Sequence, residues 1–316
     1  MANIVLTGKC DLKCPYCFAD EFIKEKSESI SVDAFLKALD FSVPDGAVGL
    51  IGGEPLIYEN IDTVLDILKH DSRFYRVMIY TNGISIDKHI DKLTDRKNHL
   101  LINLNSPDVI GKARFDRIIS NIDALSERGM RENITLGINV YEENQDFTYF
   151  CNTLRDFFFK KARISVAIPR DKSEGALNYF TRMKPTLLKL YAQLKEIGVA
   201  PCYDCNAVPK CIFTEDELEF IKTLPYVSEM ERELLLGERS VCAPIVDIYP
   251  DLTAKRCFGC FDYSVPIKNF KSINDLKNHF FLAIDSKKVH TLSCNTCADC
   301  YKHNTFSCFG GCLCYK

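Results

Sequence analysis

Short apolar runs alternate with amphipathic segments through the first half of the chain, and this alternation limits the fold more than any other feature. Repeated strand–helix units of this kind form parallel sheets. Right-handed crossovers curl six such units into a barrel or partial barrel. We therefore predict an α/β fold, a partial (βα)6 barrel, with strands at residues 3–6, 47–51, 76–81, 99–104, 134–140 and 163–168.

The glycine-rich and polar segments of this half follow predicted strands rather than precede them. Three cysteines come after the first strand, a Gly-Gly-Glu-Pro segment at 52–55 after the second, and Asn-Ser-Pro-Asp at 105–108 after the fourth. Barrel active sites are built from the loops that follow the strands. The sequence therefore predicts that these segments share one active mouth.

Cys10, Cys14 and Cys17 lie close together directly after the first predicted strand. Three thiolates at this spacing can hold an iron–sulfur cluster that leaves one iron without a protein ligand. Two alternatives stay open, because ferredoxins take a fourth cysteine from elsewhere and short cysteine spacings also occur in zinc sites. The aromatic residues Tyr16 and Phe18 on either side of Cys17 favour the cluster.

This run resembles the signature of the radical S-adenosylmethionine (SAM) superfamily, in which three cysteines are separated by three and two residues and an aromatic residue precedes the last. The resemblance implies a partial TIM-like barrel and a [4Fe-4S] cluster whose open iron is chelated by the amino and carboxylate groups of SAM. It also implies that one-electron reduction cleaves SAM to methionine and a 5'-deoxyadenosyl radical, while the protein orients the reactants and excludes side reactions.

The same resemblance assigns candidate SAM contacts. Two glycines let a ligand approach the backbone closely, and the family has such a segment where backbone groups and an acidic residue meet the SAM amino group. In the fourth strand the family often has Ser and Asp near the SAM ribose and carboxylate, where this chain has two Asn; a buried Asn satisfied by backbone is the alternative there. The candidate SAM-binding residues are Gly52, Gly53, Glu54, Pro55, Asn103, Asn105 and Tyr16.

Twelve of the sixteen cysteines follow position 201. In a large chain without an export signal, such crowding indicates metal ligands rather than disulfides. The region resembles the SPASM extension, or its shorter twitch relative, which carries auxiliary iron–sulfur clusters in peptide- and protein-modifying SAM radical enzymes. It departs from that pattern in two places, with Leu252 where the family has Gly and seven residues rather than five between Cys300 and Cys308.

The resemblance implies one or two auxiliary [4Fe-4S] clusters, and zinc is the alternative. We expect Cys242, Cys257 and Cys312 in one cluster and Cys297, Cys300 and Cys308 in the other. The fourth ligands are expected among Cys205, Cys211 and Cys294, without a choice between them. The predicted division is a radical SAM partial barrel at 1–175, a helical bridging region with Cys202, Cys205 and Cys211 at 176–240, and a smaller cysteine-rich, metal-stabilised domain at 241–316.

The charge and the apolar content of the sequence argue against two kinds of partner, nucleic acids and membranes. A net charge of −3 gives no electrostatic basis for binding nucleic acid. The sequence has neither a signal peptide nor the roughly eighteen consecutive apolar residues of a membrane span. We therefore expect a cytoplasmic protein with no nucleic-acid or membrane partner.

The leading hypothesis is an enzyme that abstracts hydrogen from a peptide or protein and leaves a crosslink, thioether, epimerised residue or oxidised side chain, as in the anaerobic maturation of ribosomal peptides. The chain starts at its first strand, so we expect no N-terminal peptide-binding domain and a separate carrier or leader-binding protein instead. An electron donor such as flavodoxin or ferredoxin is also expected. The alternatives are a small-molecule radical SAM enzyme, a sulfatase-type maturase, and a non-enzymatic iron–sulfur electron carrier or redox sensor.

Overall fold

A computed structural model describes residues 1–17, 19, 28–168, 171, 173–203, 205–242, 244–260 and 263–315. The chain forms two compact units, each made of two segments. Unit 1 comprises Met1–Thr135 and Pro244–Phe281, and unit 2 comprises Leu136–Ala243 and Leu282–Lys316. The predicted division at residues 175 and 240 stays a prediction.

Unit 1 contains a mostly parallel sheet in the order β10-β9-β8-β1-β2-β3-β4. Strand β1 lies between β2 and β8 and is parallel to both, with Ala2 opposite Val48 on one side and Val246 on the other. Strand β9 pairs antiparallel with both β8 and β10. The strands are β1 (Ala2–Val5), β2 (Ala47–Ile51), β3 (Arg76–Thr81), β4 (Asn98–Asn103), β8 (Val246–Ile248), β9 (Thr253–Lys255) and β10 (Ser264–Pro266).

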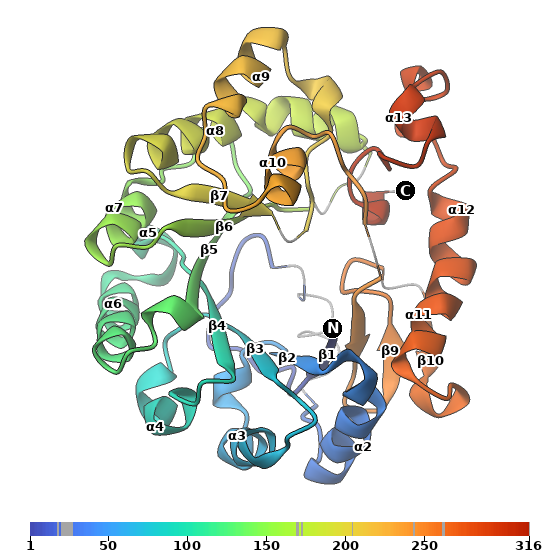
Figure 1. Ribbon diagram of the computed structural model, residues 1–316. Coiled ribbons are helices and arrows are strands. Elements are labelled where there is room, and N and C mark those ends of the chain that lie inside the picture. The colour runs from blue at the N-terminus through green and yellow to red at the C-terminus, as the bar shows by residue number, and fades with distance from the viewer. Residues whose placement is uncertain are drawn as a thin grey trace. The chain divides into compact units, whose positions relative to one another are not determined.

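Helices of unit 1 lie outside the β1–β4 strands and cover one face of them (Figure 1). Ser31 begins α2 by accepting a hydrogen bond from the Ala34 backbone N–H at 3.1 Å, as its type favours. Phe35 and Leu39 of that helix are fully buried. The helices are α2 (Val32–Ser42), α3 (Ile61–His70), α4 (Ile90–Leu93), α5 (Pro107–Ile110), α6 (Lys112–Glu127) and α11 (Ile273–Phe280), with 3-10 turns η1 (Val43–Asp45), η2 (Pro55–Ile57), η3 (Ile86–His89), η4 (Arg131–Asn133) and η6 (Ile267–Asn269).

Unit 2 contains parallel strands in the order β5-β6-β7, of which β5 begins at the last residues of unit 1. The strands are β5 (Ile134–Val140), β6 (Lys161–Val166) and β7 (Ala200–Tyr203). The helices are α7 (Thr148–Asp156), α8 (Ala176–Glu196), α9 (Glu215–Lys222), α10 (Glu229–Leu235), α12 (Ser286–Lys288) and α13 (Tyr301–Asn304), with 3-10 turns η5 (Lys210–Ile212), η8 (Asn295–Cys297) and η9 (Leu313–Tyr315). A π-helical turn, η7 (Phe281–Asp285), connects α11 to α12 along the chain.

The α/β fold with parallel strands is confirmed, and all six predicted strands are present. Thr214 and Glu217 form a capping box at the start of α9. Proline is common at the first turn of a helix, but α8 begins at Ala176 and keeps Pro185 inside. Strand β7 was missed, since it is short and contains Pro201, a residue that weakens a strand prediction.

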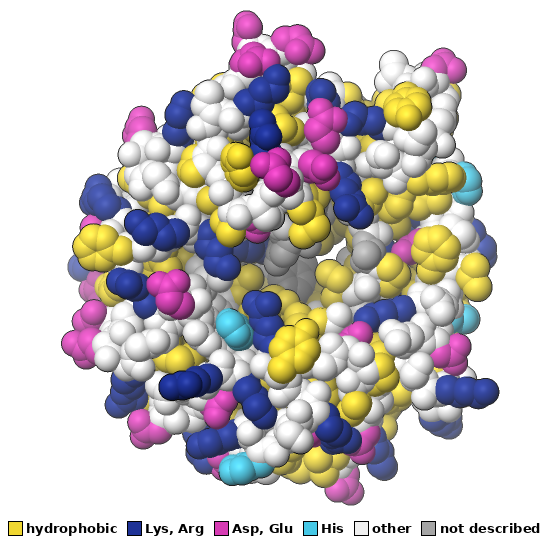
Figure 2. Space-filling model, viewed as in Figure 1, with side chains coloured by type: hydrophobic (Ala, Val, Ile, Leu, Met, Phe, Trp, Pro, Cys, Tyr) yellow, Lys and Arg dark blue, Asp and Glu magenta, His cyan; other side chains and the backbone are white. Residues whose placement is uncertain are grey.

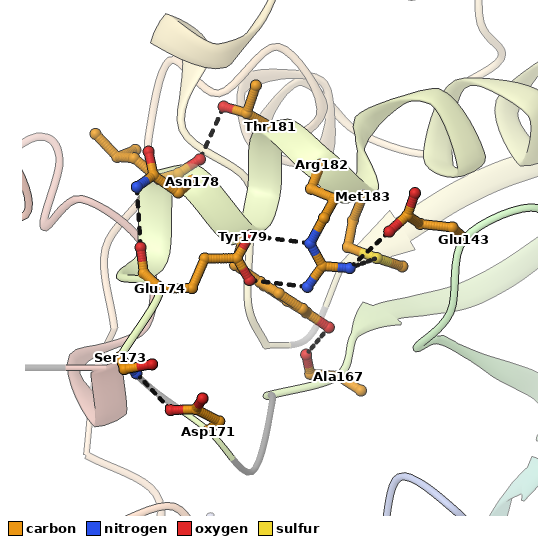
Figure 3. A network of polar contacts seen from close by, with 11 residues as sticks. Glu143, Ala167, Asp171, Ser173, Glu174, Asn178, Tyr179, Thr181, Arg182 and Met183 are labelled. Carbon is orange, nitrogen blue, oxygen red and sulfur yellow. Dashed lines mark hydrogen bonds and ion pairs between the residues drawn. The ribbon is translucent and has the colours of Figure 1, made fainter.

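Arg182 connects the start of α8 to two loops of unit 2 (Figure 3). Its guanidinium donates to both carboxylate oxygens of Glu174, at 2.9 and 2.8 Å, and to Glu143 at 3.0 Å. The Tyr179 ring lies 5.3 Å beneath it, and the Tyr179 hydroxyl donates to the Ala167 carbonyl at 2.7 Å. Exposed ion pairs contribute only about 0.2–1 kcal/mol each, so the shared cation positions the loops more than it stabilises the unit.

Acidic and basic side chains are interspersed on the face shown in Figure 2, as the small net charge leads one to expect. No helix within the described residues combines the length and the apolar character that crossing a membrane requires.

Candidate functional site

Cys10, Cys14 and Cys17 lie on the loop of unit 1 that leaves β1. The Cys17 backbone N–H donates to the Cys14 carbonyl at 3.1 Å, which turns the loop back on itself. All three side chains are partly buried, and burial raises the pKa of Cys10 to about 12 and that of Cys14 to about 11. The metal-free loop therefore carries neutral thiols near pH 7, and a metal that binds them as thiolates releases protons.

Backbone hydrogen bonds hold this loop against the segment that follows β2. The Gly53 N–H donates to the Thr7 carbonyl and the Glu54 N–H to the Lys9 carbonyl, each at 2.8 Å. A Cβ atom on Gly52 would lie 2.4 Å from the Thr7 oxygen, and one on Gly53 would lie 2.2 Å from the Lys9 oxygen. Neither glycine has a positive φ, so both are required for close approach rather than for backbone conformation.

Glu54 joins the ends of β2 and β3 through its side chain. It is 1% exposed, and its carboxyl oxygens accept hydrogen bonds from the Leu56 N–H (3.0 Å), the Thr81 hydroxyl (2.7 Å) and the Asn82 N–H (2.7 Å). Burial raises the pKa of Glu54 to about 7, although the three donors oppose the shift. Pro55 follows as the first residue of η2. The site thus holds a carboxylate that a cationic ligand would stabilise.

Asp11 and Asn82 connect the cysteine loop to the end of β3. The Asn82 side-chain amide donates to the Asp11 carboxylate at 2.6 Å, and its carbonyl oxygen accepts from the Ile84 N–H at 2.9 Å. Asp11, Thr81 and Asn82 are not among the site residues predicted from the sequence. The only available signal was this position after β3, at the edge where the loops meet.

Tyr16, Asn103 and Asn105, predicted separately, are in contact. The Asn103 amide donates to the Tyr16 hydroxyl oxygen at 2.6 Å, and the Tyr16 hydroxyl donates in turn to the Asn105 carbonyl oxygen. The Asn105 amide donates to the Cys14 sulfur at 3.7 Å. The end of β4 is therefore linked through side chains to a cysteine of the loop after β1.

In unit 2, three cysteines contact Cys312, and we call the four together the Cys312 group: Cys205, Cys242, Cys312 and Cys314. Contacts with the other three raise the pKa of the Cys312 thiol well above the usual value. Cys312 is 5% exposed and Cys314 is 2% exposed, whereas Cys205 and Cys242 are partly buried. Thiols are the ligands of both iron–sulfur and zinc sites.

A second set in unit 2, which we call the Cys297 group, consists of Cys211, Cys294, Cys297 and Cys308. The sulfur atoms of Cys294 and Cys297 are 3.4 Å apart. Burial, together with the charges of the other three members, raises the pKa of Cys211 to about 11. Cys300 lies at the start of α13, where its N–H donates to the Cys297 carbonyl at 3.2 Å.

Cys257 and Cys260 lie together in unit 1, with sulfur atoms within 4.8 Å of each other. The Cys260 N–H donates to the Cys257 carbonyl at 3.1 Å. Just before them, Leu252 has a φ of 61°, in the left-handed region that glycine prefers. The position where the SPASM pattern has Gly therefore keeps a glycine-like backbone in this chain. Cys260 and Cys314 were not selected from the sequence, since neither falls on a spacing of that pattern.

Residues 4–150 match a family model described as the radical SAM superfamily. These residues form a radical SAM domain. The superfamily consists of enzymes that catalyse radical reactions. Cys10, Cys14, Cys17, Gly52 and Gly53 all fall within residues 4–150, so the contacts described above between the cysteine loop and the segment after β2 lie in this domain.

A probable GTP 3',8-cyclase from Methanococcus maripaludis (strain C6) is 28% identical over 147 residues, which cover 45% of this chain and 48% of the relative. The chain spans about half the length of the curated relatives it matches.

Solved structures share the fold over more of the chain. Streptococcus suis SuiB bound to its precursor peptide SuiA superposes with a TM-score of 0.63 at 18% identity, covering 98% of this chain and 71% of SuiB. Native anSMEcpe with bound AdoMet and a Kp18Cys peptide gives a TM-score of 0.66 at 15% identity, covering 98% of this chain and 88% of anSMEcpe. The likeness extends beyond the radical SAM domain into the cysteine-rich region.

Proposed function

We propose that this protein is a radical SAM enzyme whose Cys10, Cys14 and Cys17 hold a [4Fe-4S] cluster. The observation that carries the proposal is the cysteine loop itself, because three thiols are held by backbone hydrogen bonds against a glycine pair that leaves no room for a Cβ atom. When bound and reduced, such a cluster supplies the electron that cleaves SAM to methionine and a 5'-deoxyadenosyl radical.

Residues of the chain bind and orient SAM in this account. Glu54 carries a buried carboxyl that its ionised form can offer to the SAM ammonium group, and Gly52 and Gly53 let the cysteine loop lie against the segment that carries Glu54. Asn103, Asn105 and Tyr16 offer polar atoms suited to the SAM ribose and carboxylate. Pro55 fixes the turn after Glu54.

The two cysteine groups of unit 2 are proposed to hold auxiliary [4Fe-4S] clusters. The sequence pattern pairs Cys242 with Cys312 and Cys297 with Cys308, and the side-chain contacts support both pairings. They further favour Cys205 as the fourth ligand in the Cys312 group and Cys211 as the fourth ligand beside Cys297, Cys300 and Cys308, with Cys294 as the alternative. Cys257 and Cys300 remain proposed ligands from the sequence pattern.

The proposed substrate is a peptide or protein. The support is the common fold with SuiB and anSMEcpe, whose structures contain a precursor peptide and a Kp18Cys peptide. A separate carrier protein and a flavodoxin- or ferredoxin-class electron donor complete the proposal. The second candidate is a small-molecule reaction, favoured by the similarity of the N-terminal half to GTP 3',8-cyclases.

The activity is tested by anaerobic incubation of the iron-loaded protein with dithionite and SAM, with 5'-deoxyadenosine measured by mass spectrometry. We expect product from the wild-type protein and none from Cys14→Ala. Cys151→Ala is the matched control, because Cys151 is buried in α7 and its sulfur contacts Gln193 rather than another cysteine in the described contacts. If wild-type protein with all of its iron–sulfur clusters gave no 5'-deoxyadenosine, the enzyme hypothesis would be refuted, and a non-enzymatic electron carrier or redox sensor would be the remaining function.

The substrate class is tested by adding either GTP or any short cysteine-rich or aromatic-rich peptide that proves to be encoded next to this gene. A mass change in the peptide, dependent on SAM and absent with Cys312→Ser, is the expected result. Conversion of GTP with no change in the peptide would select the small-molecule reaction.

A further inference from the structure

A directed chain of hydrogen bonds ends on the sulfur of Cys14, one of the three cysteines in the loop after β1. It runs from the Asn103 amide to the Tyr16 hydroxyl, from that hydroxyl to the Asn105 carbonyl oxygen, and from the Asn105 amide to the Cys14 sulfur. Hydrogen bonds linked in this way polarise one another and strengthen the last member of the chain. The strengthened member here is the N–H···S contact.

Chemistry fixes the direction of this chain when Cys14 is a metal ligand. A thiolate sulfur only accepts hydrogen bonds, so the side-chain NH2 group of Asn105, and not its oxygen, must face Cys14. The Asn105 oxygen then faces Tyr16, whose single hydroxyl proton is donated to it. Asn103 satisfies the remaining acceptor capacity of that hydroxyl.

The surrounding fold holds Asn105 in place. Its side chain is 4% exposed, and it follows β4 directly before Ser106, the N-cap of α5. The Ser106 side chain accepts from the Val109 N–H at 3.3 Å, which fixes the turn after Asn105. Because so little of Asn105 is exposed to water, its side-chain amide keeps its protein partners, and the fold itself maintains the contact with the Cys14 sulfur.

We propose that Asn105 is a positioning residue that raises the reduction potential of the cluster held by Cys10, Cys14 and Cys17. The inference rests on the proposed function. One electron passes from a flavodoxin- or ferredoxin-class donor, or from dithionite, and the added negative charge spreads onto the sulfur ligands. Hydrogen bonds to the sulfurs of a cluster stabilise this charge and are a known determinant of its potential.

The test is a redox titration of the iron-loaded full-length protein without SAM, followed by electron paramagnetic resonance (EPR). The relevant signal is identified as the one that changes when SAM is added to a separate sample. In Asn105→Leu, which removes the N–H without adding charge, we expect the ratio of reduced to oxidised cluster at a fixed potential to fall about tenfold, or about 59 mV for one electron. Asn105→Asp is expected to lower the ratio at least as far.

Two further variants make each outcome decisive. Tyr16→Phe removes the hydroxyl that donates to the Asn105 carbonyl oxygen, but it leaves the Asn105 amide that donates to Cys14. We therefore expect a smaller fall in the ratio of reduced to oxidised cluster, of about threefold. Asn274→Leu, a matched change at an exposed position of α11, should leave the ratio unchanged. If Asn105→Leu does not retain its cluster, Tyr16→Phe decides the question.

An unchanged ratio in loaded Asn105→Leu, or in loaded Tyr16→Phe where the first variant does not load, would overturn the inference. So would a fall confined to Asn105→Asp, since added charge alone would then explain it, and so would an equal fall in Asn274→Leu. The proposed function fails differently, because the wild-type protein would then show no cluster signal that responds to SAM.

Discussion

The close approach of the Gly53 backbone to the cysteine loop makes Gly53→Ala the most informative single substitution. The added Cβ atom would lie 2.2 Å from the Lys9 carbonyl oxygen and 2.6 Å from its carbon, whereas ordinary contacts begin at 3.4 Å. Both are backbone atoms one residue before Cys10. The Lys9 carbonyl must therefore retreat by about 1.2 Å, and the loop that carries Cys10 must move with it.

The size of the effect follows from two terms. Overpacking of a close-packed site costs about 1–3 kcal/mol, and loss of the Glu54 N–H to Lys9 hydrogen bond costs about 0.5–1.5 kcal/mol. We expect the free energy of unfolding to fall by about 2–4 kcal/mol. We also expect iron content at the site, and with it SAM binding, to fall at least tenfold, since the three thiols no longer converge.

Urea unfolding and equilibrium dialysis with labelled SAM measure these two effects. The control is Gly129→Ala, which meets no heavy atom within 4 Å but has a φ of +79°, so it costs about 1–2 kcal/mol through backbone strain alone. It should leave SAM binding intact. Wild-type SAM affinity and iron content in Gly53→Ala would refute the steric reasoning.

Three further predictions follow from the described contacts. Burial raises the pKa of Glu54 to about 7, so the ionised fraction of this carboxyl grows through neutral pH. SAM affinity measured by dialysis should therefore rise between about pH 6 and about pH 8. This rise should be absent in Glu54→Gln, and a wild-type affinity that does not change with pH would contradict the contact between Glu54 and the SAM ammonium group. Cys312→Ser and Cys211→Ser should each lose one cluster, about four irons per chain by colorimetric iron and sulfide assay, and zinc without sulfide in the wild type would contradict both assignments. Tyr203→Phe should lower the free energy of unfolding by about 1–3 kcal/mol in urea titrations, because it leaves the fully buried Tyr191 hydroxyl without its partner at 2.7 Å; no change would show that water replaces that partner.

The strands could be predicted because their signal is local. Apolar runs such as 47–51 and 134–140 are set by residues adjacent in the chain, and the structure has strands at the same bounds. Helix α8 shows the limit of such reasoning, since buried Tyr179 and Phe180 extend it on the N-terminal side of Pro185. Packing within unit 2 outweighs the local preference of proline to begin a helix.

The candidate site divides in the same way. Cys10, Cys14 and Cys17 form a motif because a single loop carries them, and the motif could be read directly from the sequence. Contacts between residues far apart in the chain could not. Asn105 reaches Cys14 across ninety-one positions, and Cys242 meets Cys312 only once the fold is known. Spacing identifies the ligands' chemistry, whereas tertiary structure decides which of them share a metal.

The most direct test of the account is the EPR spectrum of the reduced, iron-loaded protein recorded with and without SAM. If Cys10, Cys14 and Cys17 hold a cluster with an open iron, SAM must change the spectrum of that cluster in the wild-type protein. The responsive signal should be absent from Cys14→Ala while other cluster signals persist. A wild-type spectrum that SAM leaves unchanged, or a responsive signal that survives in Cys14→Ala, would contradict the account.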